Sequence, residues 1–427
     1  MPTSPSRPTS PSRARHSDFD LFAVTAPGLE SIAAGELKAL GIKGRQETGG
    51  VGFEGTIERI YLANLWLRTV SRVIVRLGRF HASTFYELER RAKKIDWSDF
   101  LPASGSVEVR VTCRKSRLYH SDAVAERVLG AIARVAPHGV DLRIGAQPVG
   151  DESETENESR QLIVVRIVDD QCEISADSSG ELLHRRGYRQ EIAKAPLRET
   201  LAAAMILASG WQKEQPLLDP MCGSGTIPIE AALIGNGKAP GLERSFQFMT
   251  WPGFDPALWS ETVASAKASV RENPLDIRAA DRDAGAIAAA SRNAERAGVA
   301  GNVRFATEAV SGTFATLEDP ADRTGGGWII TNPPYGVRVG ETGDLRNLYA
   351  TIGSVVREKK GWRLGILAAD DSLARQMRVP LQSRFDTRNG GIPVRYLVSD
   401  KAEPGRRPRK REQATERSAR LTGADRS

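Results

Sequence analysis

Apolar residues in the first half of the chain recur with two spacings, one typical of strands and one of helices. Alternation, as in SVEVRVTC at 106–113, predicts a half-buried strand, and apolar positions three or four apart, as at 121–135, predict a helix. We expect strands at 21–26, 51–55, 69–80 and 106–113, a hairpin at 162–177, and helices at 29–41, 85–95 and 121–135. The mixture predicts α+β units.

From Glu199 onward, short apolar runs alternate with longer amphipathic segments. This order is typical of a parallel sheet with helices on both faces, a Rossmann-like α/β fold. The expected strands are 216–219, 277–281, 303–306, 328–331 and 363–369. Near the end, Asn389-Gly390-Gly391 lies between two strand patterns and predicts a closing antiparallel hairpin.

Positive charge is concentrated at the two ends of the chain. Of the net charge of +7, residues 1–16 carry +3 and residues 401–427 carry +5, which leaves −1 for 17–400. We expect disordered basic tails at 1–17 and 401–427, the second either adding nonspecific phosphate affinity or only aiding solubility. The acidic stretch at 150–160 is expected to be an exposed loop.

Composition excludes several classes of protein. Hydrophobic residues make up 40% and charged residues 26%, a globular balance without an apolar run long enough to cross a bilayer. The Ser/Pro/Arg-rich start lacks the apolar stretch of a secretory signal. Cys113, Cys172 and Cys222 are far apart and form no CxxC pair. We expect a reduced, metal-free, cytoplasmic protein with no membrane span.

Two glycines, Gly223 and Gly225, lie between a predicted strand and a predicted helix in the stretch DPMCGSGT. Such a turn lets the backbone approach a ligand at the carboxyl edge of a parallel sheet. A phosphate loop would have a lysine and wider glycine spacing, so a nucleoside is favoured over a triphosphate. A tight turn without a ligand is the alternative. At the end of the next strand, Asp281 can accept hydrogen bonds from a ribose diol, whereas Asp283 suits a helix cap.

Asn332-Pro333-Pro334-Tyr335 follows the predicted strand 328–331 directly. The exocyclic amine of a base is a poor nucleophile because its lone pair is delocalised into the ring. The Asn332 side-chain oxygen and the Pro333 carbonyl can each accept one amine hydrogen and aim the lone pair, and Tyr335 can stack on the base. A plain proline turn is the alternative, and the motif does not identify the acceptor base.

The stretch DPMCGSGT followed by IPIEAA resembles the first motif of class I S-adenosylmethionine-dependent methyltransferases. It is closest to the RNA methyltransferases with an N-terminal THUMP domain, a group that contains the 23S ribosomal RNA guanine-N2 enzymes. By this resemblance S-adenosylmethionine is the cofactor, Asp219 orients its methionine amino end, and Cys222 packs beside it. The expected cofactor site comprises Asp219, Cys222, Gly223, Gly225, Thr226, Asp281, Glu308 and Asn332.

The adenine end of the cofactor leaves two assignments open. After the third strand this family usually carries an acidic or amide residue, and strand spacing puts Ala309 at that position. Glu308 serves if the loop shifts by one residue, or else a backbone group contacts the adenine.

The front half is similar, in the order of its elements, to a ferredoxin-like unit followed by a THUMP domain. We expect the ferredoxin-like unit at 18–60, the THUMP domain at 61–178, a connector at 179–205 and the methyltransferase domain at 206–400. A separate aromatic-rich insertion, 236–275, is expected to pack as a cap over the catalytic sheet.

Two groups of residues are candidates for RNA contact. The loop after the strand at 106–113 combines cations with an aromatic residue, and the connector is rich in arginine; these residues are Arg114, Lys115, Arg117, Tyr119, Arg185 and Arg186. The alternatives are a solvated loop with Tyr119 against the helix, and ion pairs between domains made by the connector arginines.

The resemblance implies methyl transfer to guanine N2 in structured RNA, with 23S ribosomal RNA as the first candidate and transfer RNA as the second. Adenine-N6 methylation is the competing enzymatic hypothesis. An RNA-binding protein with a vestigial cofactor site is the non-enzymatic one. The expected catalytic residues are Asn332, Pro333 and Tyr335.

Overall fold

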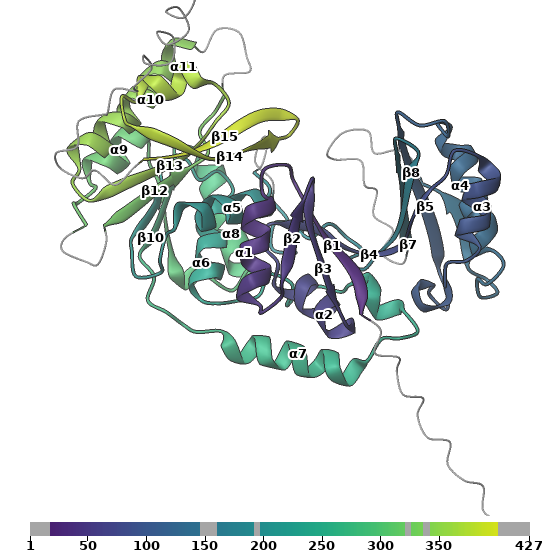
Figure 1. Ribbon diagram of the computed structural model, residues 1–427. Helices are drawn as coiled ribbons and strands as arrows, with labels where there is room; N and C mark the ends of the chain where they lie inside the picture. The colour runs from purple at the N-terminus through teal and green to yellow at the C-terminus, as the bar shows by residue number, and fades with distance from the viewer. Residues whose placement is uncertain (1–17, 146–159, 192–196, 321–325, 336–341, 400–427) are drawn as a thin grey trace, which may run out of the picture.

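The computed structural model describes residues 18–145, 160–191, 197–320, 326–335 and 342–399, arranged around two β-sheets (Figure 1). The basic tails expected at 1–17 and 401–427, and all but the last residue of the loop expected at 150–160, lie outside these residues. Within the described ranges, no helix has the length and apolarity needed to span a membrane.

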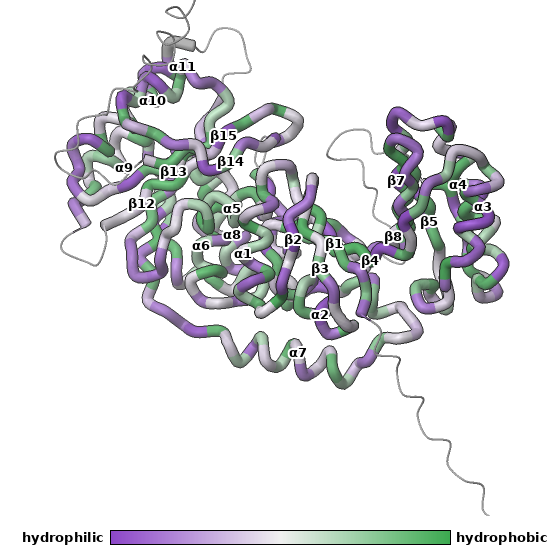
Figure 2. Tube along the Cα trace, viewed as in Figure 1, coloured by the Kyte–Doolittle hydropathy of each residue, from purple (hydrophilic) through white to green (hydrophobic). Residues whose placement is uncertain are grey.

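The front half forms one eight-stranded sheet in the order β2-β3-β1-β4-β8-β7-β5-β6. Its strands are β1 (Phe19–Thr25), β2 (Gly44–Glu47), β3 (Gly50–Gly55), β4 (Val70–His81), β5 (Ser106–Arg114), β6 (Asp141–Ile144), β7 (Arg160–Val168) and β8 (Gln171–Asp177). Its helices are α1 (Glu30–Ala39), α2 (Ile57–Trp66), α3 (Phe85–Ala92) and α4 (Ser121–Ile132). In Figure 2 hydrophobic residues follow β1 and β5, whereas the outward side of α3 is hydrophilic.

Strand β4 joins the two units of the front half. Its first residues pair with β1, from Val70 opposite Thr25 to Val75 opposite Leu21. Its later residues pair with β8, from Ile74 opposite Asp177 to His81 opposite Gln171. One strand of 12 residues therefore belongs to both halves of the sheet.

The second sheet has the order β11-β10-β9-β12-β13-β15-β14. Its strands are β9 (Leu217–Asp219), β10 (Ile277–Asp281), β11 (Val303–Thr307), β12 (Gly327–Thr331), β13 (Trp362–Ala368), β14 (Leu381–Asn389) and β15 (Ile392–Ser399). The helices are α5 (Glu199–Ser209), α6 (Thr226–Gly235), α7 (Pro256–Ser269), α8 (Ala284–Arg296), α9 (Val310–Ala315), α10 (Thr342–Glu358) and α11 (Asp371–Gln376). The parallel strands and the closing antiparallel hairpin are confirmed.

Strand β9 is the switch point of this sheet, because β10 pairs with one side of it and β12 with the other. In open α/β sheets the connections leave such a point in opposite directions and open a crevice at the carboxyl ends of the strands. The Gly223 turn follows β9, and Asn332 follows β12. The fold thus brings both sequence motifs to one edge.

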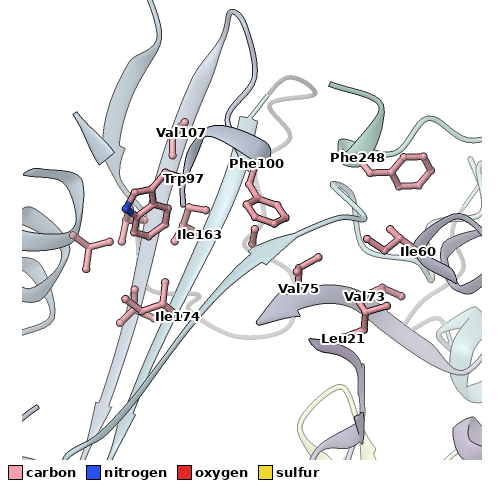
Figure 3. Close-up of a cluster of buried hydrophobic side chains, with 14 of the residues drawn as sticks. Leu21, Ile60, Val73, Val75, Trp97, Phe100, Val107, Ile163, Ile174 and Phe248 are labelled. Atoms are coloured by element: carbon pink, nitrogen blue, oxygen red, sulfur yellow. The ribbon is translucent and has the colours of Figure 1, made fainter. Parts of the chain in front are cut away.

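The aromatic insertion does not cap the catalytic sheet, so that expectation was wrong. Phe246, Phe248 and Trp251 belong to the hydrophobic core of the front half, where Phe248 lies close to Ile60 (Figure 3). The Tyr61 and Phe248 ring centroids are 4.6 Å apart. The insertion therefore joins the two halves, because the apolar surface that it covers belongs to the front sheet.

A second contact joins the halves at the turn between β1 and α1. At Gly28, which has φ +88°, an added Cβ would lie 2.0 Å from the carbonyl oxygen of Asp386 on β14. Only glycine fits both this backbone conformation and this close approach. The next residue, Leu29, is buried in the same cluster as Phe385. The front half is thereby seated on the closing hairpin.

Candidate active site

The turn between β9 and α6 has a glycine at each position where another residue would be strained. Gly223 has φ +53° and Gly225 has φ +85°. A Cβ on Gly225 would lie 3.0 Å from the Cβ of Ala290 on α8. The turn therefore leads without side-chain obstruction into α6, which begins at Thr226 and packs closely against α8 at Gly225.

Asp219 connects this turn to the strand that carries the proline motif. Its Oδ1 accepts hydrogen bonds from the Met221 backbone N–H at 3.2 Å and from the Thr331 hydroxyl at 2.8 Å. Burial raises the pKa of the Asp219 carboxyl to about 7, a rise that the Thr331 hydrogen bond opposes and nearby Asp281 reinforces. A buried carboxyl of this kind is suited to receive a cationic ligand group.

Asp281 lies at the end of β10 and also contacts the glycine turn. Its Oδ2 accepts from the Gly223 N–H and its Oδ1 from the Asp283 N–H, both at 3.0 Å. Asp283 caps α8 by accepting from the N–H groups of Gly285 and Ala286, which confirms the cap expected for it. Asp283 is thus engaged in capping α8, and Asp281 is the carboxylate that lies beside the glycine turn at the carboxyl end of β10.

The two residues considered for the adenine end lie beside Asp281. The Glu308 backbone N–H donates to the Asp281 carbonyl oxygen at 2.9 Å. Ala309 occupies the N-cap position of α9, and its methyl side chain offers no hydrogen-bonding group. Of the two, only Glu308 brings a side-chain acceptor to this edge.

The proline motif directly continues β12. Pro333 is buried, whereas Asn332 and Tyr335 are half-buried. The Tyr335 hydroxyl donates to Asn332 Oδ1, and Asn389 Nδ2 on the closing hairpin donates to the Tyr335 oxygen at 3.2 Å. The position of Asn389 in the site could not be predicted, because the Asn-Gly-Gly pattern predicts a turn and says nothing about what the asparagine side chain contacts.

These side chains fit a nucleoside cofactor with a cationic amino end. Asp219 supplies a carboxylate, Gly223 and Gly225 keep the space above the turn free of side chains, and Asp281 supplies acceptors for a diol. Cys222 is buried, and burial raises its pKa well above its usual value, so it is a packing thiol and not a thiolate nucleophile. Among the described residues, no cluster of His, Cys, Asp and Glu has the makings of a metal site.

The basic loop after β5 is held to the front sheet by a buried leucine and a backbone hydrogen bond, while its basic and aromatic side chains are exposed to solvent. Leu118 is buried, while Tyr119 is 69% exposed, so the alternative with Tyr119 packed against the helix was wrong. Asp170 Oδ1 accepts from the Arg117 N–H at 2.7 Å. Lys115 and Arg117 on this loop are exposed, as is Arg114, the last residue of β5. The loop thus offers cations and an aromatic face to solvent.

Tyr86, which the sequence reasoning missed, lies at the same end of the front sheet. It is 74% exposed, and the Arg90 guanidinium lies 5.8 Å from its ring centroid. The segment before it is fixed there because the Ala82 N–H donates to the Asp170 carbonyl at 2.9 Å. Its exposure could have been predicted, because Tyr86 falls on the polar side of the predicted helix 85–95.

Arg186 is not available for RNA, which corrects that expectation. Its guanidinium is buried between the two halves, where it donates to the carbonyls of Leu183 and Arg68 and lies 3.6 Å from Glu230. Arg185 remains partly exposed, with an ion pair to Glu181 at 3.7 Å. The interdomain alternative is thus the correct one for Arg186.

Comparison with known families divides the chain in the same order. Residues 20–74 match the RlmL ferredoxin-like domain, residues 82–144 match the THUMP domain, and residues 186–397 match the RMKL-like methyltransferase domain. These matches confirm the expected fold class.

Relatives match over most of the chain. A Synechocystis protein named "Putative RNA methyltransferase slr0064" is 35% identical over 381 residues, 88% of this chain and 95% of the relative. The ribosomal RNA large subunit methyltransferase K/L of Magnetococcus marinus is 36% identical over 403 residues, 89% of this chain but 53% of the relative, so the chain spans about half of that protein.

A solved structure described as "a putative methyltransferase complexed with SAH" is 30% identical, with a TM-score of 0.77 over 90% of this chain and 99% of the other. The two front units and the α/β catalytic domain of the structure agree with these comparisons. The chain belongs to the S-adenosylmethionine-dependent RNA methyltransferases that carry a ferredoxin-like unit and a THUMP domain in front of the catalytic domain.

Proposed function

We propose that the protein methylates the exocyclic N2 amine of a guanine in structured RNA, with 23S ribosomal RNA in the cytoplasm as the substrate. The observation that carries this proposal is the position of Asn332 and Pro333 at the end of β12, next to the strand that carries Asp219. The relatives named for the ribosomal large subunit support the choice of RNA. Transfer RNA is the alternative substrate to ribosomal RNA.

The cofactor supplies an electrophilic methyl group when it is bound. Asn332 Oδ1 and the Pro333 carbonyl accept the two amine hydrogens, which pulls the nitrogen toward pyramidal geometry and points its lone pair toward the methyl group that the cofactor would present. One of these two hydrogens leaves as a proton when the nitrogen gains the methyl group. Tyr335 provides a face on which the base stacks. Extruding a paired base costs roughly a few kcal/mol, so a loop or bulge nucleotide is the favoured target.

The test of this proposal uses total RNA from a strain that lacks the gene. The purified protein and labelled S-adenosylmethionine are incubated with that RNA, and the modified nucleoside is identified by mass spectrometry. We expect N2-methylguanosine in the 23S fraction. Methyladenosine without N2-methylguanosine would overturn the guanine assignment, and label in the transfer RNA fraction alone would overturn the ribosomal one.

Cofactor affinity should depend on pH through Asp219. Its raised pKa of about 7 means that the carboxyl is largely protonated at pH 6 and ionised at pH 8. Only the ionised form attracts the amino group of the cofactor, so we expect S-adenosylhomocysteine to bind about tenfold more tightly at pH 8 than at pH 6. Isothermal titration calorimetry measures this change.

Two variants control for the pH effect. Asp219→Asn should bind weakly and with little pH dependence, whereas Asp283→Asn, which alters only the exposed cap of α8, should keep the dependence of the wild type. Equal wild-type affinities from pH 6 to pH 8 would contradict the raised pKa, and an Asp219→Asn affinity equal to that of the wild type at pH 8 would remove Asp219 from cofactor binding.

The loop after β5 should contribute to RNA affinity and not to cofactor affinity. We expect Tyr119→Ala to weaken RNA binding by about tenfold through loss of base stacking. Lys115→Ala should weaken it and reduce the slope of log affinity against log salt by about one, as for one lost phosphate contact. Filter binding over a range of salt concentrations measures both effects.

Arg143→Ala is the matched control for the lysine variant, because Arg143 is an exposed cation in the edge strand β6, away from the basic loop. RNA affinity should be close to that of the wild type. If Tyr119→Ala and Lys115→Ala also bind RNA like the wild type, the loop is not an RNA contact.

A further inference from the structure

The acceptor oxygen that the target amine needs is already in use. Asn332 Oδ1 accepts the hydrogen of the Tyr335 hydroxyl. Burial raises the pKa of this phenol above its ordinary value, so the hydroxyl stays protonated and keeps its donor. A base amine that enters the site therefore competes with the Tyr335 hydroxyl for Asn332 Oδ1, because two hydrogen bonds to one amide oxygen weaken each other's hold on it.

The displaced hydroxyl has a second partner within reach. Asn389 Nδ2 lies 3.2 Å from the Tyr335 oxygen and donates to it. A carboxamide can also accept a hydrogen bond through its oxygen, so Asn389 can serve the hydroxyl as donor before the base arrives and as acceptor afterwards. When the amine takes the place of the hydroxyl on Asn332 Oδ1, a half-buried hydroxyl without Asn389 would have no acceptor in the site, which opposes binding of the base.

Asn389 is held at a fixed place by the packing of its hairpin. It is the last residue of β14 and pairs with Ile392 across the turn. Lower on the hairpin, the Phe385 and Tyr396 rings stack with centroids 5.1 Å apart. The turn at Gly28 lies against the backbone carbonyl of Asp386, the residue after Phe385. The hairpin is therefore packed through Phe385 on its buried face and through the Asp386 backbone against the Gly28 turn, on the stretch that leads to Asn389.

We propose that Asn389 is a positioning residue for methyl transfer, whose amide holds the Tyr335 hydroxyl when the target amine takes its place on Asn332 Oδ1. The ring of Tyr335 then keeps one orientation while the base stacks on it. The role goes beyond the proposed function, although it rests on transfer to a base amine. It concerns which residue accepts the hydrogen bond of the Tyr335 hydroxyl when the base is bound, and it applies to whichever base is methylated.

The test is a double-mutant cycle of Asn389→Ala with Tyr335→Phe on the RNA that the wild type methylates. Asn389→Ala should lower kcat by about tenfold, the effect of one hydrogen bond in the transition state, while KM for RNA changes less than about twofold. In the Tyr335→Phe background the same substitution should change kcat less than about twofold, because the hydroxyl is already absent.

Asn389→Asp is the conservative variant, because its carboxylate also accepts from the phenol. It should retain kcat within about threefold of the wild type. Arg388→Ala, at the adjacent exposed position, removes a hydrogen bond to the Gly391 carbonyl across the same turn. Its effect, of whatever size, should be the same with tyrosine or phenylalanine at position 335, and melting temperatures of all variants show whether the hairpin is intact.

Additive losses in the cycle, or equal losses for Asn389→Ala and Asn389→Asp, would overturn the role of Asn389 and leave the proposed function intact. Absence of methyl transfer to any RNA by the wild type would remove the proposed function and this role together. The two failures are thus distinguishable.

Discussion

Replacing Asn332 by alanine is expected to lower kcat for methyl transfer at least about a hundredfold, the usual effect of losing one group that stabilises a transition state. The amide oxygen is one of two acceptors that orient the amine, and alanine leaves only the Pro333 carbonyl. The affinity for S-adenosylhomocysteine should change less than about threefold, because Asp219, the glycine turn and Asp281 are untouched. Single-turnover kinetics and calorimetry separate the two effects.

Asn347→Ala is the matched control. Asn347 lies exposed on α10 and its backbone carbonyl, which the substitution keeps, accepts from Thr351. This variant should methylate like the wild type. A turnover of Asn332→Ala equal to that of the control would remove Asn332 from the mechanism.

Substituting Arg186 by methionine is expected to destabilise the folded protein by about 3 kcal/mol. Glu230 is fully buried, and the substitution removes the Arg186 guanidinium 3.6 Å from its carboxylate. The Tyr188 hydroxyl, at 3.1 Å, is retained, but it is neutral. The Leu183 and Arg68 carbonyls also lose a donor. Urea denaturation followed by tryptophan fluorescence measures the loss.

A second substitution tests the reason for this loss. Arg186→Met combined with Glu230→Met should recover part of the stability, because the buried Glu230 charge is then gone, although Arg68, which Glu230 also stabilises, stays buried. Arg185→Met, at the partly exposed neighbour, should cost less than about 1 kcal/mol. Equal effects of Arg185→Met and Arg186→Met would show that burial of the Arg186 pair is not what stabilises the interface.

The catalytic sheet was predictable because each of its parallel strands is a short apolar run that ends in a polar or proline motif. Knowing that parallel strands end at one edge was enough to bring Asp219, Asp281 and Asn332 together. The edge strands β2 and β6 were missed, since GRQE and DLRI are largely exposed and carry little apolar pattern. Helix α2 was missed as well, because burial on more than one side hides its periodicity.

What the sequence could not show is which partner each polar or aromatic residue chooses. Arg185 and Arg186 are neighbours of one type, yet one is partly exposed and the other is buried against Glu230. Phe248 lies in the aromatic insertion that was expected to cap the catalytic sheet, but it packs in the core of the front half. These outcomes depend on contacts between segments far apart in the chain, which local pattern does not record.

The shared strand β4 and the turn at Gly28 together hold the basic loop at one distance from the reacting site. The first fixes the THUMP half to the ferredoxin-like half, and the second fixes that half to the hairpin beside Asn332. The span from the basic loop to the reacting amine is then a set length. We therefore expect the target nucleotide to be chosen by its distance from the part of the RNA that the basic loop holds, and the surrounding sequence to matter through the shape that it gives to the RNA.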